Sequence, residues 1–105
     1  MMRMYDSISV IVCTRDRGSE VAKTVASVLN NSYPDYELLL VDQSRENQLE
    51  ESLKAFRNNP RFHYYRCQSF GLSAGRNFGA AKALGDLIAF TDDDCEAPPK
   101  WLECI

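Results

Sequence analysis

The feature that most constrains the fold of this chain is a regular alternation between unbroken apolar runs and stretches with helical periodicity. The apolar runs cover residues 8–12, 38–41, 62–65 and 87–90. A strand that is apolar on both sides needs cover on both of its faces, and this is typical of parallel sheets. We therefore predict four strands of one mostly parallel sheet at these positions.

The segments between the runs predict helices, because their apolar residues recur at a spacing of three or four. These helices are expected over residues 21–29, 49–56 and 74–84, with their apolar stripes facing the core. A fourth helix is expected to begin at Pro98, since proline is tolerated in a first turn. The expected boundary residues are Ser19 as an N-cap, Asn59-Pro60 as a helix stop and Gly85 as a left-handed C-cap.

The resulting order, βαβαβαβ, predicts an α/β domain in which an open, mostly parallel sheet carries helices on both faces. A length of 105 residues suits a single domain, residues 1–105. Its expected fourth helix is barely two turns long, so we expect the N-terminal part of a longer protein, truncated at its C-terminal end.

Composition excludes several classes of protein. The formal net charge is −3, and the pI of about 5.1 argues against a nucleic-acid partner. The sequence has neither a polybasic cluster nor an apolar stretch near 20 residues, so a cytoplasmic location is the default expectation. The four cysteines lack the spacing of a zinc or redox motif, and we expect reduced thiols packed as small apolar groups.

Polar residues follow three of the predicted strands, at residues 14–17, 42–45 and 92–94. The carboxyl ends of parallel strands meet at one edge of the sheet, where ligands bind in open α/β folds. A single site is therefore predicted there.

Three successive aspartates, residues 92–94, are the strongest candidates at this edge. Adjacent carboxylates repel one another unless a cation compensates, and Mg²⁺ or Mn²⁺ takes carboxylate oxygens as ligands. Residues two apart in a strand face the same way, so Asp92 and Asp94 are expected to address one ligand while Asp93 turns away. The alternative is a solvated acidic turn.

Two further features are less specific. Asp42 could bond a nucleobase or ribose, or could serve only as a turn or capping residue. The small residues of segment 71–77 would let the start of a helix approach an anion, and Arg76 could pair with a phosphate. A plain helix entry explains this segment equally well.

Together, residues 8–17, 41–44, 75–79 and 89–94 resemble the motifs of glycosyltransferase family 2. The resemblance implies the GT-A fold, a Rossmann-like architecture, of which this chain would be the N-terminal, nucleotide-sugar-binding part. It implies that Thr14, Asp16 and Asp42 line the pocket for base and ribose and that Arg76 reaches the ribose or phosphates. It also implies that Asp92 and Asp94 form a DXD motif, in which Asp92 holds the ribose and both hold the metal.

The implied activity is transfer of a sugar from a nucleoside diphosphate, bound through Mg or Mn, to an unknown acceptor such as a saccharide or lipid-linked saccharide. The catalytic base is expected outside this chain, which would be inactive alone. The full-length protein could associate with the inner face of a membrane. The chain departs from common members by Cys13 in place of proline, Arg15-Asp16 in place of Tyr-Asn, and Gln43 in place of aspartate.

Other α/β functions lack their motifs. No Gly-x-Gly-x-x-Gly follows the first strand, as an oxidoreductase would need, and no Gly-Lys-Ser/Thr marks a P-loop. A two-metal phosphohydrolase would need a second cluster of His and Asp, and a receiver module an aspartate after the third strand. A non-catalytic module that binds nucleotide or self-associates stays open, since an exposed sheet edge would favour a homodimer.

Overall fold

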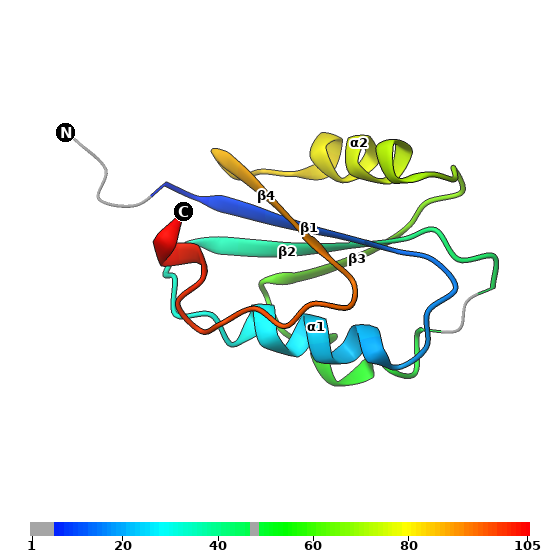
Figure 1. Ribbon diagram of the computed structural model, residues 1–105, viewed down its shortest axis with the longest axis horizontal. Coiled ribbons are helices and arrows are strands. Elements are labelled where there is room, and N and C mark those ends of the chain that lie inside the picture. The colour runs from blue at the N-terminus through cyan, green and yellow to red at the C-terminus, as the bar shows by residue number, and fades with distance from the viewer. Residues whose placement is uncertain (1–5, 47–48) are drawn as a thin grey trace.

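The computed structural model describes residues 6–46 and 49–105, and it confirms the predicted α/β architecture with its four strands (Figure 1). The strands are β1 (Ile8–Thr14), β2 (Tyr36–Asp42), β3 (Phe62–Arg66) and β4 (Leu87–Asp92). The α-helices are α1 (Glu20–Leu29) and α2 (Leu72–Lys82), and two short 3₁₀ helices are η1 (Lys54–Phe56) and η2 (Leu102–Cys104).

All strand pairs are parallel, and the order across the sheet is β3-β2-β1-β4. Helix α1 covers one face and α2 covers the other (Figure 1). From β1 the chain moves outward to β2 and β3, and then crosses back to place β4 on the other side of β1. The strand order therefore reverses between β1 and β4, and the carboxyl ends of these two strands form the topological switch point.

The core has two unequal layers because successive strand residues face opposite sides of the sheet. The larger layer joins the even-numbered residues of β1 and β2 to α1: Val10, Val12, Leu38, Leu40, Val21, Val25 and Val28. The smaller layer lies under α2 and contains Ile11, Leu39 and Val41. A Cβ on Gly79 would lie 2.7 Å from Cγ2 of Ile11, so the absence of a side chain there lets α2 approach the sheet.

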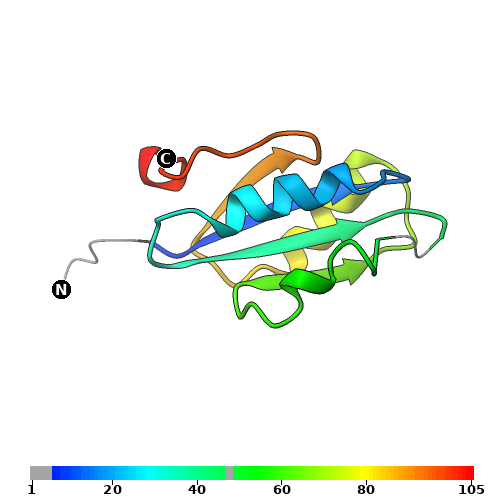
Figure 2. The ribbon, with the colours of Figure 1, turned by 90° about the horizontal axis from the view of Figure 1, so that it is seen from below.

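The C-terminal segment runs back along α1, on the same side of the sheet (Figures 1 and 2). The side-chain amide of Asn31 donates to the carbonyl of Pro98 at 3.0 Å, and Ser27 Oγ accepts from the N–H of Ala97 at 2.8 Å. Leu102 then enters the α1 layer of the core. These contacts fix the turn that follows β4 against α1.

Two predicted helices are much shorter than expected. Residues 50–53 form turns, and only η1 is helical in the segment predicted as a helix over 49–56; residues 47–48 before it lie outside the described residues. Leu49 and Leu53 are buried as expected, but one turn is enough to bury them. The fourth helix likewise amounts to η2 alone.

The predicted N-cap position of Ser19 is confirmed, whereas the C-cap predicted at Gly85 is wrong. Ser19 stands at the N-cap of α1 but has φ −68° and ψ −9°, a helical conformation, and its side chain makes no capping hydrogen bond. Helix α2 ends at Lys82 and continues through an extended Ala83, so no left-handed C-cap forms at Gly85. Gly85 is needed for space instead, because a Cβ there would lie 2.7 Å from the backbone nitrogen of Ser9.

The edge strand β4 is the least covered part of the sheet. Leu87, Ile88 and Phe90 are each 42% exposed, whereas the core residues of β1 and β2 are almost fully buried. None of the helices in residues 6–46 and 49–105 has the length and apolarity to cross a membrane.

Candidate functional site

The structure brings the polar strand ends together at the switch point. Thr14 lies opposite Asp42 in the β1–β2 register, and Cys13 lies opposite Asp92 in the β1–β4 register. Asp42 and Asp92 thus lie on the two strands that flank β1, one residue apart in register. Two strand spacings separate their backbones by about 10 Å. This distance lets one extended ligand contact both strand ends.

Asp93 turns away from its neighbours, toward α1. Its Oδ2 accepts a hydrogen bond from Thr14 Oγ1 at 2.9 Å and lies 3.3 Å from Nε of Arg17. Its backbone carbonyl accepts from Thr24 Oγ1 at 2.9 Å. Asp93 therefore ties the turn after β4 to both β1 and α1, a fixing role that the sequence did not reveal.

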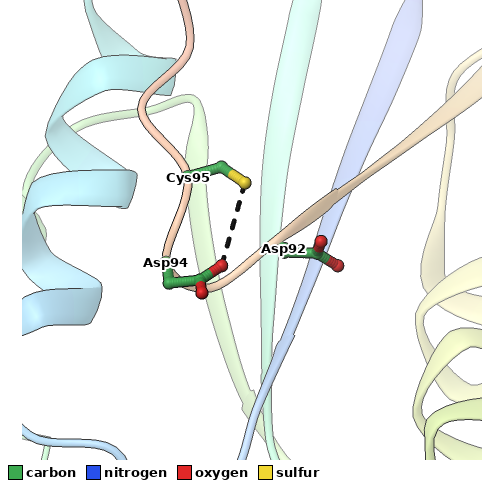
Figure 3. A group of neighbouring side chains, drawn as sticks. All are labelled: Asp92, Asp94 and Cys95. Atoms are coloured by element: carbon green, nitrogen blue, oxygen red, sulfur yellow. Dashed lines mark hydrogen bonds between the residues drawn. The ribbon is translucent and has the colours of Figure 1, made fainter.

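Asp92 and Asp94 are exposed and lie beside Cys95 (Figure 3). One ligand atom from each of these three side chains can be chosen so that all lie within 4.8 Å of one another, and the Cys95 thiol is 3.8 Å from Oδ1 of Asp94. Two carboxylates at this spacing fit Mg²⁺ or Mn²⁺, which leave their other positions to water and phosphate. The donor set is thus compatible with the predicted metal.

No spacing rule predicts that Cys95 belongs to this group. Spacing rules search for cysteines paired with other cysteines or histidines, whereas here the partners are aspartates. The signal available was its position directly after the acidic run.

Asp42 is fully buried, and both of its carboxylate oxygens are engaged. Oδ1 accepts from the N–H of Ser44 at 2.9 Å, which is the geometry of an Asx turn. Oδ2 accepts from the hydroxyl of Tyr64 and lies 3.7 Å from Nη1 of Arg66. Burial and this carboxylate raise the pKa of Tyr64 above its ordinary value. The turn role foreseen for Asp42 is therefore present, and its contact with a base or ribose stays a prediction.

Asp16 joins the loops after β1 and β2. It has φ 53°, a left-handed conformation that aspartate tolerates better than most residues. Its N–H donates to Ser44 Oγ at 2.7 Å, and its Oδ1 accepts from the N–H of Arg45 at 3.2 Å. Its other carboxylate oxygen pairs with Arg15 at 3.7 Å. Asp16 thus shapes the rim of the site above Asp42.

Arg76 lies on the other face of the sheet. Its guanidinium is 5.1 Å from the centroid of the Phe90 ring, on the α2 side of β4. Because Phe90 and Asp92 alternate with Thr91 along β4, Asp92 shares this face. The predicted site residues accordingly form two groups: Thr14, Asp16 and Asp42 toward the α1 side, and Arg76 with Asp92 toward the α2 side.

Two cavities open at this edge of the sheet. The first, of about 340 Å³, is lined by Cys13, Thr14, Arg15, Arg17, Gln43, Gly71, Leu72 and Asp93. The second, of about 370 Å³, is lined by Gln43, Ser44, Arg45, Arg66, Cys67, Gln68 and Phe70. Gln43 borders both and is therefore the side chain at which they meet. Four arginines line the two cavities, and one of them, Arg17, is the partner of Asp93, so the edge combines carboxylates with cationic groups.

Comparisons with known proteins agree with this geometry. The family model "Glycosyl transferase family 2" matches residues 9–105. A glucosyl-dolichyl phosphate glucuronosyltransferase of Haloferax volcanii is 32% identical over 101 residues, which are 93% of this chain and 32% of the relative.

Two solved structures share the fold. S. aureus TarS 1–349 in complex with UDP has a TM-score of 0.78 at 24% identity, over 93% of this chain and 30% of the TarS 1–349 chain. The mannosyltransferase PcManGT from Pyrobaculum calidifontis, in complex with GDP-Man and Mn²⁺, has a TM-score of 0.79 at 19% identity, over 90% of this chain and 30% of that protein. This chain spans about a third of the length of each of these three matched chains. With the family model covering nearly all of its residues, the chain belongs to glycosyl transferase family 2.

Proposed function

We propose that this chain binds a nucleoside-diphosphate sugar at the carboxyl edge between β1 and β4, through a divalent cation on Asp92 and Asp94. The observation that carries the proposal is the exposed acidic pair at the switch point of a parallel sheet. Two structures of the same fold support it, because one contains UDP and the other contains GDP-Man with Mn²⁺.

Different residues of this chain would hold the acidic turn, position the ribose and phosphates, and shape the pocket for the base. Asp93, held by Thr14 and Arg17, would keep the acidic turn in place so that Asp92 and Asp94 face outward. Asp92, with Arg76 on the same face, would position the ribose and phosphates, while Thr14, Asp16 and Asp42 would shape the pocket for the base. The bound cation would offset negative charge on the diphosphate as it leaves.

Transfer to the acceptor would need groups beyond those found here. We assign no catalytic base within these residues, and we propose that a longer protein supplies it, because this chain spans only about a third of each of the three matched chains described above. The acceptor would be a saccharide or a lipid-linked saccharide, and the protein would act in the cytoplasm or at the inner face of a membrane.

Thermal denaturation tests the donor proposal. Mn²⁺ with UDP or GDP is expected to raise the melting temperature of the wild-type chain, and Asp94→Ala to remove most of the increase. The matched control is Glu96→Ala, which removes the same charge from an exposed residue two positions away that is outside the acidic group. If neither nucleotide shifts the melting temperature of the folded chain, or if both variants behave alike, the donor proposal is wrong.

A non-catalytic, self-associating module is the second candidate, favoured by the open edge of β4 and its half-covered apolar residues. Sedimentation at several concentrations tests it, with Ile88→Lys as the variant. A wild-type dimer that this lysine dissociates would support the module, and a wild-type monomer at all concentrations would refute it.

A further inference from the structure

We propose that Phe70 is the surface on which the nucleobase of the donor stacks, and that it divides the base-binding cavity from the phosphate-binding cavity. This inference rests on the proposed function and assigns a specificity residue within it. Phe70 lies in the loop between β3 and α2, directly before Gly71, the N-cap residue of α2.

Phe70 is an exposed ring on a fixed backbone. Its side chain is 56% exposed, although a phenyl group is favoured in the core. The amide of Gln43 donates to the carbonyl of Ser69 at 2.9 Å and to that of Gly71 at 2.8 Å, so the residues on either side of Phe70 are both held. Gly71 has φ 98°, which sets the sharp turn into α2. The loop is therefore preorganised to present this ring.

One face of the ring already carries a flat cationic partner. The guanidinium carbon of Arg15 lies 4.3 Å from the centroid of Phe70, across the edge of the sheet from the β1–α1 loop. Arg15 lines the first cavity and Phe70 lines the second, while Gln43 borders both. The stacked side chains of Arg15 and Phe70 therefore lie between the two cavities, next to Gln43.

The two cavities differ in the chemistry of their lining residues: one suits the diphosphate of a nucleoside diphosphate and the other suits its nucleobase. The first is lined by the guanidinium groups of Arg15 and Arg17 and borders, at Asp93, the acidic turn that would hold the cation, so it suits the diphosphate. The second offers amide, hydroxyl and guanidinium groups that can bond a base edge, from Ser44, Gln68 and Arg66. Among the described residues that line the two cavities, Phe70 is the one aromatic side chain.

Stacking on this ring would give affinity that depends on the base and not on the phosphates. Alanine substitution of an aromatic platform typically weakens binding by about ten-fold per base. Arg15 lies on the opposite face of the ring and lines the first cavity, where its guanidinium could contact the diphosphate, so the two contacts would contribute separately.

The test is isothermal titration of the chain with UDP, GDP and inorganic pyrophosphate, each with Mn²⁺. For Phe70→Ala we expect about ten-fold weaker binding of the preferred nucleotide, unchanged binding of pyrophosphate, and recovery in Phe70→Tyr. Leu84→Ala is the control, since this 87% exposed side chain lies at the opposite end of the sheet.

Three results would overturn the inference: nucleotide affinity unchanged in Phe70→Ala, an equal loss for pyrophosphate, or wild-type affinities for UDP and GDP no higher than for pyrophosphate. If the wild-type chain binds none of the three probes, the proposed function itself fails and this inference fails with it. The pyrophosphate measurement on the wild-type chain therefore distinguishes the two failures.

Discussion

The role of Asp93 in fixing the turn after β4 leads to the most specific prediction. Its carboxylate accepts a hydrogen bond as a charged group, whereas its backbone carbonyl accepts one as a neutral group. Thr14→Val replaces a buried hydroxyl with a methyl group of nearly the same size and removes the donor to the Asp93 carboxylate. Thr24→Val likewise removes the donor to the Asp93 carbonyl. Both threonines are at most 2% exposed, so the loss in each case is mainly that of the hydrogen bond.

The magnitudes follow from the type of acceptor. A hydrogen bond to a charged group contributes about 1.5–3 kcal/mol and one between neutral groups about 1 kcal/mol. The Asp93 side chain is 13% exposed and keeps Arg17 at 3.3 Å, so we expect the lower half of the charged range, about 1.5–2 kcal/mol, for Thr14→Val. Thr24→Val should cost about 1 kcal/mol. In a domain of this size, the larger loss corresponds to a fall in Tm on the order of 5–10 °C.

Urea denaturation followed by circular dichroism measures both free energies of unfolding. Thr14→Ser is the matched control, because it keeps the hydroxyl and loses one methyl group. The reasoning is refuted if Thr14→Val costs less than Thr24→Val, or if Thr14→Ser is as destabilising as Thr14→Val. A second readout is affinity for UDP with Mn²⁺, which should fall several-fold in Thr14→Val as the acidic turn loosens.

Two further predictions concern burial. The pKa of Tyr64 is raised by burial and by Asp42, so its proton is held more tightly in the folded than in the unfolded chain. The resulting contribution to the free energy of unfolding is present below about pH 10, the unfolded pKa, and should decline as pH rises above it. Urea denaturation between about pH 9 and 11 should show a shallower decline of the free energy of unfolding in Tyr64→Phe than in the wild type. An equal decline in both would contradict this role of Tyr64. Gly79→Ala should destabilise the chain by about 1–2 kcal/mol, since the new Cβ would lie 2.7 Å from Ile11 and outweigh the gain in helix propensity. A Gly79→Ala variant as stable as wild type in urea would show that α2 can shift at little cost.

The strands and the sheet edge could be predicted from the sequence because continuous apolarity has few alternatives in a parallel sheet. Ile8–Thr14 and Leu87–Asp92 begin where the predicted runs begin and extend them by only two residues at the carboxyl end. The same pattern placed the polar strand ends on one edge, and alternation along a strand placed Asp92 and Asp94 on a different side from Asp93.

The parts that could not be predicted depend on tertiary contacts. The anchoring of Asp93 by Thr14 and Thr24 joins residues 79 and 69 positions apart, and no local pattern reports it. The burial of Asp42 depends on a hydrogen bond from Tyr64 of β3, and the sequence pattern identifies Tyr64 only as part of an apolar run. The stripe from Leu49 to Phe56 predicted a full helix because periodicity measures which side is apolar, not how many turns form.

The central claim is that the cation on Asp92 and Asp94 links the nucleotide to this chain. Isothermal titration with UDP and GDP, in Mn²⁺ and then in excess EDTA, tests it directly on the wild-type chain and on Asp94→Asn. We predict that affinity for at least one nucleotide falls ten-fold or more both on chelation and on substitution. Equal affinity with and without the metal, or in the variant and the wild type, would contradict the account.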